Sequence, residues 1–486
     1  MLLLIGISVS AAGISRVHLM KNKKQRKGKG SWAMISMTTG NFLEESSLLT
    51  VTNESRNYKS TLDVFSKKNL TTVDEELERA ALKVEADISK IRTKIHRFPE
   101  SMRSLGNDGG YMVPNVVAIG PYHRHRRHLR HAEEIKRAAA YYFCRDSGHL
   151  TKAVFERIFS VAGEARSCYY DDDVTDGISE AEFAAMMFHD GCFLVQFMLS
   201  YTGEEVAPAL QSWFSIMSHV GRDVFLLENQ IPLLVLQALM EFRPVPVGQF
   251  IVNTASTFYM DLDLQVECPI LTLSSITQWP HLLELLRNCV SGSVSDDESP
   301  MSSFPPTSSA IELGQIGIKL TASRTTQLKD MGIKRGPLFG KLFLTPFLMG
   351  NTGTCMLVNM VALEHCIAKT WGSNCAVIGS YVAVLSMLMN REEDVHELRA
   401  NGLVKGRLSD QETLQFFKTL VKHIEIGPSY KDILVQIEAY RRDRWLWIAL
   451  HKLVYNNIKT IVAVFSVVGV LGGIFKTLLD IKQHQK

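Results

Sequence analysis

The chain has 486 residues, of which 46% are hydrophobic and 21% are charged, and its formal net charge is +3. This composition places most of the chain in the globular class and is sufficient for one large or two medium domains. A net charge this small excludes the strongly basic class of nucleic-acid-binding proteins, so we expect no nucleic-acid partner.

The N-terminal region opens with an apolar run, Met1 to Ser15, which is followed by a basic segment between Lys21 and Lys29. This order of apolar and basic residues is the reverse of a secretory signal peptide. The run is either an anchor with its N-terminus outside the cell or an extension of no structural importance. The residues after it are polar and rich in serine, threonine and lysine, so we predict that 1–71 is disordered or weakly structured.

Ordered structure is expected to begin with a helix after Thr72. Thr72 and Glu75 have the spacing of a capping box, and apolar residues then recur at intervals of four and three from Leu77 to Ile95. This pattern predicts one amphipathic helix. It is too short for a convincing coiled coil, so packing on the core is favoured over pairing with a partner helix. We expect the globular region to span 72–455.

A basic segment follows from His123 to His131, where nine residues include four histidines and four arginines. Zinc binding is disfavoured there because neighbouring guanidinium groups repel a cation and no cysteine lies nearby. The segment is either a solvated loop or a surface that binds an acidic partner or lipid headgroups.

The acidic segment from Asp171 to Phe183 resembles a calcium-binding loop in its alternating oxygen donors. Such a loop needs glycine at its sixth position for a sharp turn, but Asp176 stands there and Gly177 comes one residue late. We therefore interpret the segment as an acidic loop that caps the helix starting near Glu180.

The remaining elements predict a mainly helical α+β protein, with a large helical body and a small strand region. A Ser/Pro/Asp-rich stretch at 291–309 cannot form a core and is expected to be a flexible insertion. Short runs after it, bounded by Gly, Pro or Thr, predict strands at 316–321 and 338–348. Helices are predicted at 133–145, 152–170, 181–201, 224–242 with a break at Pro232, 357–369, 377–391, 410–424 and 430–455.

The eight cysteines include no C-x-x-C pair, and several lie among apolar residues. We interpret them as reduced, buried thiols rather than as disulfides or zinc ligands. The chain also lacks the phosphate-binding G-x-x-x-x-G-K-[ST] and zinc-binding H-E-x-x-H motifs, so we expect neither a metal nor a cofactor.

The C-terminal segment from Thr460 to Phe475 has sixteen residues without a charge or a strongly polar group. As a helix it covers about 24 Å of a hydrocarbon core roughly 30 Å thick, so 456–480 is predicted to be a single transmembrane helix with Lys476 snorkelling. The alternatives are a helix buried against the body and a helix lying in the membrane interface. Basic residues are more numerous before the segment than after it, which favours a cytoplasmic body.

Three motifs are distinctive. The first runs from Ile95 to His123 and ends in Ile-Gly-Pro-Tyr-His, the second is Asp-Gly-Cys-Phe-Leu from Asp190, and the third is Leu-Leu-Glu-Asn-Gln-Ile-Pro ending at Pro232. In this order, together with Asn359, they resemble the plant family known as domain of unknown function 247, from about Ile91 to the C-terminus. The motif residues, which we expect to act in structure or recognition, are Pro99, Tyr111, Pro114, Gly120, Pro121, Tyr122, His123, Lys136, Asp190, Gly191, Cys192, Phe193, Glu228, Asn229, Gln230 and Pro232.

The resemblance implies a membrane-anchored plant protein that recognises another protein. The family has no established enzymatic activity, and some grass members are similar to self-incompatibility determinants, so recognition of that type is included in the hypothesis. Read from the residues alone, the Gly-Pro pair at 120–121 predicts a structural turn. An alternative function is an enzyme whose acid/base site consists of His123, Asp190 and Glu228.

Overall fold

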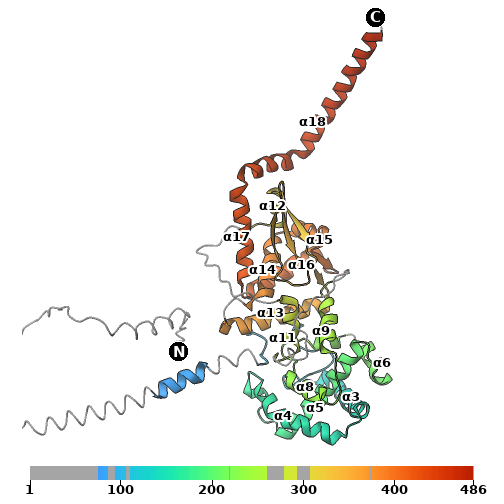
Figure 1. Ribbon diagram of the computed structural model, residues 1–486, viewed down its shortest axis with the longest axis vertical. Helices are drawn as coiled ribbons and strands as arrows, with labels where there is room; N and C mark the ends of the chain where they lie inside the picture. Colours follow the sequence, from blue (N-terminus) through green and yellow to red (C-terminus); the bar gives the residue numbers. More distant parts are fainter. Residues whose placement is uncertain are drawn as a thin grey trace, which may run out of the picture. The chain divides into compact units, whose positions relative to one another are not determined.

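A computed structural model gives the arrangement of the chain (Figure 1). It describes residues 75–85, 94–105, 110–217, 219–259, 279–292, 307–371 and 375–484. The chain divides into two units, Met1–Arg79 and Ala80–Lys486, and nearly all described residues belong to the second. The predicted disorder of 1–71, the capping box at Thr72 and most of the Ser/Pro-rich insertion lie outside the described residues.

One group of helices surrounds α5, Glu180–Tyr201. Ser179 and Glu182 form a capping box at its start, so two amides that the helix leaves unpaired have acceptors. Nearly all of α5 after this first turn is buried, because helices cover it on several sides. Its neighbours are α3 (His131–Ser147), α4 (Thr151–Ser167), α6 (Pro208–Ile216), α8 (Leu233–Met240) and α9 (Val247–Ser256).

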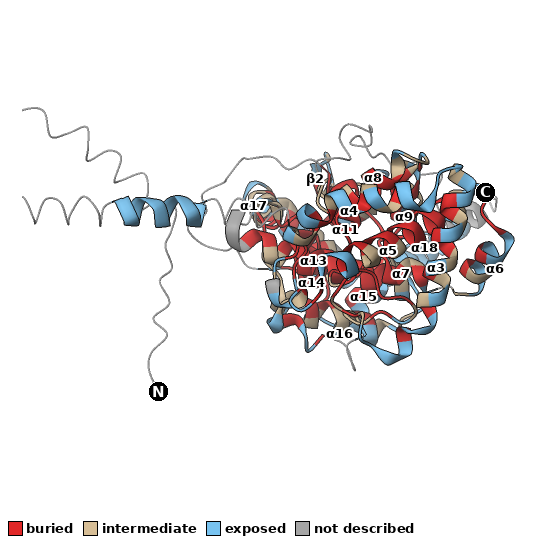
Figure 2. Ribbon diagram, turned by 90° about the horizontal axis from the view of Figure 1, so that it is seen from below, coloured by how far each residue is buried: buried red, intermediate tan, exposed pale blue. Residues whose placement is uncertain are grey.

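A second group of helices surrounds α13, Asn351–Trp371, and α14, Val377–Leu388. Figure 2 shows buried residues concentrated in α5, α13 and α14, whereas the helix of residues 75–85 is exposed. The helices that contact α13 or α14 are α7 (Val220–Asp223), α11 (Leu282–Ser291), α16 (Asp410–Leu420) and α17 (Pro428–Asp443). Farther out, α15 (Glu392–Ala400) packs on α16, and α12 (Ala310–Gln315) packs on α15. Short 3-10 helices lie at Glu100–Met102, Arg127–Leu129, Asp172–Val174 and Val421–His423.

Two small sheets complete the second unit. The three-stranded sheet has the order β1 (Ile318–Ala322), β3 (Gly340–Leu344), β2 (Gly332–Arg335), with β1 parallel and β2 antiparallel to β3. The two-stranded sheet pairs β4 (Phe347–Met349) in parallel with β5 (Val404–Gly406). A mainly helical fold with a small strand region after the Ser/Pro-rich segment is therefore confirmed.

The C-terminal helix is α18, Trp445–His484. Among the described helices, α5 alone is long and apolar enough to cross a membrane, and 78% of its most apolar window is buried inside the protein. The apolar stretch of α18, Val462–Thr477, is shorter than 18 residues. Because α5 is largely buried, its length and apolar character are those of a core helix.

Several sequence predictions were wrong in detail. The strand predicted at 338–348 is two strands, β3 and β4, which belong to different sheets. Ile95 does not continue the first helix but forms a β-bridge with Tyr169, which leaves only 75–85 as described helix. The stretch from Val224 to Pro232 is not helical, because its side-chain amides bond nearby carbonyl oxygens in place of the helical pattern. The predicted helix at 430–455 is two helices, since Arg444 has φ −128° and ψ 26° between α17 and α18.

Candidate functional site

The loop from Lys94 to His123 is mostly irregular, so its backbone amides need acceptors outside a sheet or helix. Asp223, at the end of α7, supplies one group of acceptors. Its carboxylate is fully buried and is also paired with Arg222 at 2.9 Å. It accepts hydrogen bonds from the amides of Asn115, Val116 and Val117, with N–O distances of 3.0, 2.7 and 3.2 Å.

Two side-chain amides of the third motif, those of Asn229 and Gln230, form hydrogen bonds with backbone groups. Asn229 accepts a hydrogen bond from the Ile119 amide at 2.7 Å and donates to the Val117 carbonyl at 3.0 Å. Gln230 donates to the carbonyl oxygens of Val224 and Leu226, at 2.6 and 2.8 Å. Both side chains are buried, and an unpaired amide there would be costly. These hydrogen bonds explain why the two polar side chains can be buried.

The Gly-Pro turn is where the first and second motifs meet. The Gly120 amide donates to Asp190 on α5 at 2.7 Å, and Lys136 on α3 pairs with the same carboxylate at 2.7 Å. Gly120 has φ +75°, and a Cβ atom there would lie 2.5 Å from the Gln230 carbonyl oxygen. Burial by itself lowers the pKa of Lys136, but the carboxylates of Asp190 and Glu133 raise it above its usual range. The predicted structural turn is present.

Glu228 and His123 lie side by side below the surface. His123 Nε2 is 3.6 Å from the Glu228 carboxylate, and that carboxylate accepts the Phe98 amide at 2.9 Å. His123 Nδ1 accepts from Arg126 at 3.0 Å, so the proton of the neutral ring is on Nε2, facing Glu228. Burial and the neighbouring Arg126 lower the pKa of His123 to about 4, which keeps the imidazole neutral at pH 7.

The predicted acid/base group is only partly assembled. His123 and Glu228 are adjacent, whereas the hydrogen bonds of Asp190 go to Lys136 and the Gly120 amide. None of the three lines either of the two larger cavities described below. The carboxylates of Glu228 and Asp190 accept hydrogen bonds from backbone amides, and Asp190 also pairs with Lys136. Buried polar groups in a folded core need partners of this kind.

The other motif residues also have packing roles. Gly191 lets α5 approach α8, since a Cβ atom there would lie 2.7 Å from Leu239. Burial raises the pKa of the Cys192 thiol well above its usual range, and the ring of Phe193 packs edge-on against Phe214. Tyr122 donates to the Ile95 carbonyl at 3.1 Å, and the Pro114 carbonyl lies 3.1 Å from the His128 ring. Pro99 immediately precedes a 3-10 helix, and Pro232 immediately precedes α8.

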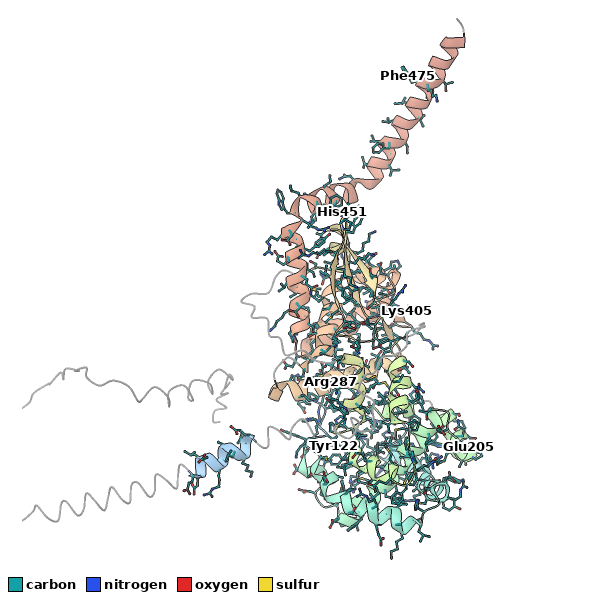
Figure 3. All side chains as sticks on the ribbon, viewed as in Figure 1. Tyr122, Glu205, Arg287, Lys405, His451 and Phe475 are labelled. Atoms are coloured by element: carbon teal, nitrogen blue, oxygen red, sulfur yellow. The ribbon has the colours of Figure 1, made fainter. Side chains whose placement is uncertain are left out.

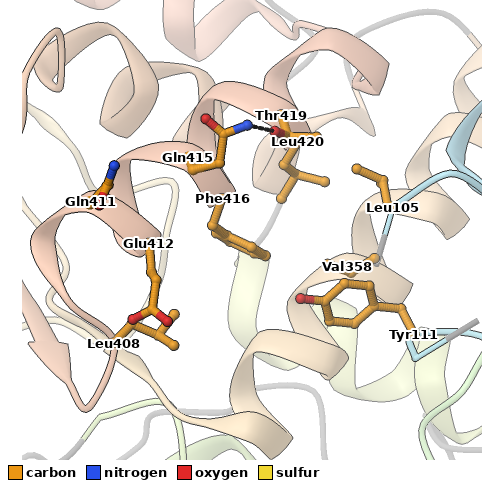
Figure 4. A pocket seen from close by; sticks show the side chains of 10 residues that line it. All are labelled: Leu105, Tyr111, Val358, Leu408, Gln411, Glu412, Gln415, Phe416, Thr419 and Leu420. Atoms are coloured by element: carbon orange, nitrogen blue, oxygen red, sulfur yellow. Dashed lines mark hydrogen bonds between the residues drawn. The ribbon is translucent and has the colours of Figure 1, made fainter. Parts of the chain in front are cut away.

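Tyr111 is the motif residue that faces open space. A groove of about 700 Å³ lies between it and α16, and Figure 4 shows the rings of Tyr111 and Phe416 on opposite sides. Asn359 on α13 holds the Tyr111 backbone by donating to its carbonyl at 2.9 Å, and the same side chain accepts the Leu227 amide at 2.8 Å. We call this the Tyr111 groove; its lining is Leu105, Tyr111, Val358, Leu408, Gln411, Glu412, Gln415, Phe416, Thr419 and Leu420.

A second cavity, of about 900 Å³, shares Tyr111 and Leu408 with the groove and lies at the start of α13. Arg222, His219 and Arg407 line it, and no carboxylate is among the described residues that do so. Sequence reasoning missed both cavities. Their walls come from segments more than 200 residues apart, and no local pattern indicates that these segments meet.

The segments considered above for metal binding have simple structural explanations. Asp171 is paired with Arg97, and no cluster of potential metal ligands occurs among the residues that the structure describes. The seven described cysteines form no disulfide, and Cys168, Cys366 and Cys375 are only partly buried, unlike the buried thiols expected. In the basic segment the side chains of Arg126, Arg127 and Arg130 are exposed, while Leu129 is buried beneath them.

Comparison with known proteins gives a family but no function. The sequence profile of DUF247, described as a plant protein of unknown function, matches residues 95–471. The UPF0481 protein At3g47200 of Arabidopsis thaliana is 26% identical over 393 residues, which are 73% of this chain and 78% of that protein. The putative UPF0481 protein At3g02645 of the same species is 26% identical over 178 residues, covering 35% of this chain and 30% of that protein. No solved structure matches the chain.

Proposed function

Because the chain belongs to the plant family DUF247, as its motifs predicted, and this family has no known function, we propose a role from the structure. The protein is a membrane-anchored recognition protein: α18 inserts into a bilayer, and the body binds a segment of another protein in the Tyr111 groove. The proposal includes recognition of the self-incompatibility type, which the family resemblance implies.

The observation that carries the proposal is the exposed apolar surface of α18. Between Val462 and Phe475, nine large apolar side chains are 53% to 73% exposed. Covering them with hydrocarbon instead of water is worth on the order of 10 kcal/mol. No charged residue interrupts this stretch.

The polar groups in this stretch and just after it also suit a bilayer. The Ser466 hydroxyl donates to the Val462 carbonyl at 2.8 Å, and Thr477 donates to the Gly473 carbonyl at 2.9 Å. Both hydroxyls are thus paired inside their own helix, as lipid requires. Arg441, Arg442 and Arg444 precede the helix and favour a cytoplasmic body.

The groove has the composition of a protein-binding surface. Tyr111 and Phe416 supply aromatic surface on its opposite sides, and Gln411 and Gln415 supply hydrogen-bonding amides. Burial raises the pKa of Tyr111, so its hydroxyl is a neutral hydrogen-bond donor at pH 7. Since the other motif residues are engaged in the core, Tyr111 is the motif residue best placed for contact with a partner.

The anchor is tested by membrane fractionation with protease protection, on the full chain and on a version ending at Tyr455. That version keeps the part of α18 that touches the body, including Ile448 and His451. We expect that only the full chain resists carbonate extraction and that its body is digested from the cytosolic side. A Val467→Asp variant should weaken insertion, whereas Val435→Asp, on an exposed site of α17, should not. If both lengths are extracted, the anchor is wrong.

The groove is tested by a photo-crosslinking amino acid placed at Phe416 in the full chain within plant membranes. The matched control position is Phe159 on α4, which is 39% exposed. We expect one discrete protein adduct from position 416, its loss in a Tyr111→Ala background, and no such adduct from position 159. Identical adducts from both positions would assign recognition to another surface.

A further inference from the structure

Three lysines lie side by side across the three-stranded sheet. Lys341 on β3 is the register partner of Lys319 on β1 and of Lys334 on β2. Residues directly opposite each other point to the same face of a sheet, so the three ammonium groups share one face. We call this set the lysine row. Its members are all exposed, while the next register set, Leu320, Leu342 and Ile333, faces the body.

The lysine row has no carboxylate partner among the described residues, although acids are close by. Arg335, next to Lys334, pairs with Asp443 at 2.7 Å. The lysines instead lie over aromatic rings: Lys319 Nζ is 4.6 Å from the centre of Phe339, and Lys334 Nζ is 4.9 Å from the centre of Phe343. Like charges on directly opposite residues destabilise a sheet. The aromatic contacts offset part of this repulsion for Lys319 and Lys334, whereas Lys341, at the centre of the row, has no such contact among the described residues.

The lysine row adjoins the first turns of α18. The ring of Phe339 packs edge-on against Trp447 and His451, with centroid distances of 6.4 and 5.6 Å, and His451 also lies 3.1 Å from the Gln315 carbonyl. Figure 3 shows His451 and Phe475 on the same helix. The apolar stretch begins at Thr460, nine residues after His451, which is about 14 Å along a helix.

The surface beside the row has further features of a membrane interface. Trp445 and Leu446, in the first turn of α18, are 66% and 65% exposed. Tryptophan is enriched at the level of lipid headgroups, where its ring is partly apolar and its N–H can be hydrated. A bilayer that holds α18 would thus meet the lysine row and these side chains together.

We propose that the lysine row binds anionic phospholipid headgroups on the surface of the bilayer into which α18 inserts. The inference rests on the proposed anchoring by α18 and adds the lipid class and the orientation of the body. Ammonium groups attract phosphate and carboxylate as point charges, and the attraction extends about 8 Å at physiological salt. Lipid is favoured over an acidic protein because the bilayer is the anion-bearing surface that anchoring places next to the sheet.

The test measures lysine reactivity in the full chain, reconstituted into vesicles of phosphatidylcholine alone or with roughly a third phosphatidylserine. Amine acylation followed by mass spectrometry reports each lysine separately. We expect acylation of the lysine row to fall about threefold with phosphatidylserine and to recover at high salt, because screening weakens the contact. Lys152 on α4, which is exposed and remote in sequence, is the internal reference and should not change.

Charge variants provide the matched comparison. The variant Lys319→Gln, Lys334→Gln, Lys341→Gln should associate with phosphatidylserine vesicles about tenfold more slowly than the control Lys83→Gln, Lys152→Gln, Lys422→Gln, and the two should be equal on phosphatidylcholine alone. All six lysines are exposed, so both variants should fold.

The outcomes separate the two proposals. If the chain resists carbonate extraction from both kinds of vesicle but the row is acylated equally in both, the lipid contact is wrong and the anchor stands. If the chain inserts into neither, the anchor is wrong and the lipid contact falls with it. Stronger protection by soluble polyglutamate than by phosphatidylserine would assign the row to an acidic protein and overturn the lipid contact.

Discussion

The loop of residues 94–123 and the three-stranded sheet use polar side chains in opposite ways. In the loop region, the carboxylates and amides of Asp223, Asn229 and Asp190 are buried, and backbone groups bind them. In the sheet, Lys341 is exposed between two other lysines, and no described carboxylate pairs with it. The first arrangement is explained by folding alone. The second brings like charges together, which disfavours the sheet, and the proposed lipid contact rests on this observation.

Removing a buried acceptor should have the largest effect. Asp223→Ala takes away the partner of three amides and of Arg222, so we expect a loss of about 3–5 kcal/mol in the free energy of unfolding. Urea unfolding of the detergent-solubilised full chain measures it. Asp176→Ala, at an exposed site, should change stability by less than about 0.5 kcal/mol. A loss below about 1 kcal/mol for Asp223→Ala would show that the loop finds other acceptors.

Acidification should act on the same region through His123. Its pKa is about 4 in the folded protein and about 6.5 in an unfolded chain, so between these values only the unfolded chain binds the proton. The contribution of His123 to the free energy of unfolding is therefore fully present above about pH 6.5. It decreases by about 3 kcal/mol as the pH falls to 4. Urea unfolding at several pH values should show a shallower decrease for His123→Gln than for the exposed control His131→Gln. Equal slopes would contradict the assignment.

A comparison of Gly120 with Gly148 distinguishes the effect of backbone strain from the effect of close packing. Gly120 and Gly148 have φ of +75° and +72°, but only Gly120 faces the Gln230 carbonyl at 2.5 Å from an added Cβ atom. Gly120→Ala should lower the free energy of unfolding by about 3 kcal/mol. Gly148→Ala should lower it by about 1 kcal/mol, which is the contribution of backbone strain alone. Thermal unfolding of the two variants measures the difference. Similar costs would mean that the turn moves away from Gln230.

Gln196 on α5 is an exception within the buried region. It is fully buried, and neither atom of its amide has a hydrogen-bond partner among the described residues. Gln196→Met should stabilise the protein by about 1 kcal/mol, whereas Gln230→Met, which removes bonds to two carbonyls, should destabilise it by about 3 kcal/mol. Calorimetry of both variants checks the contrast. A destabilised Gln196→Met variant would reveal a bound group at this site.

The smallest effect is expected in the sheet. Lys341→Gln removes the central charge of the row and should raise stability by about 0.5 kcal/mol at low salt, less at high salt. Lys152→Gln on α4, where Glu156 is 3.7 Å away, should not raise it. Thermal unfolding at two salt concentrations tests this. A destabilised Lys341→Gln variant would mean that the row serves the fold.

The sequence by itself determined the features that depend on residues close together in the chain, namely several helices and the uncharged C-terminal stretch. The periods of apolar residues predicted α3, α4, α5, α14 and α16, and the uncharged stretch in α18 is visible without a structure. These signals are local because a helix pairs its backbone within four residues. The family followed in the same way, from three short motifs in a fixed order.

Only the tertiary structure decided the contacts between distant segments. Ile95 continues an apolar pattern in the sequence, yet it pairs with Tyr169, and Glu228 finds its amide at Phe98, 130 residues earlier. The spacing of the lysine row along the chain does not reveal its register across three strands. Such contacts depend on which surfaces pack together, and this is set by the burial of many side chains at once rather than by any local pattern.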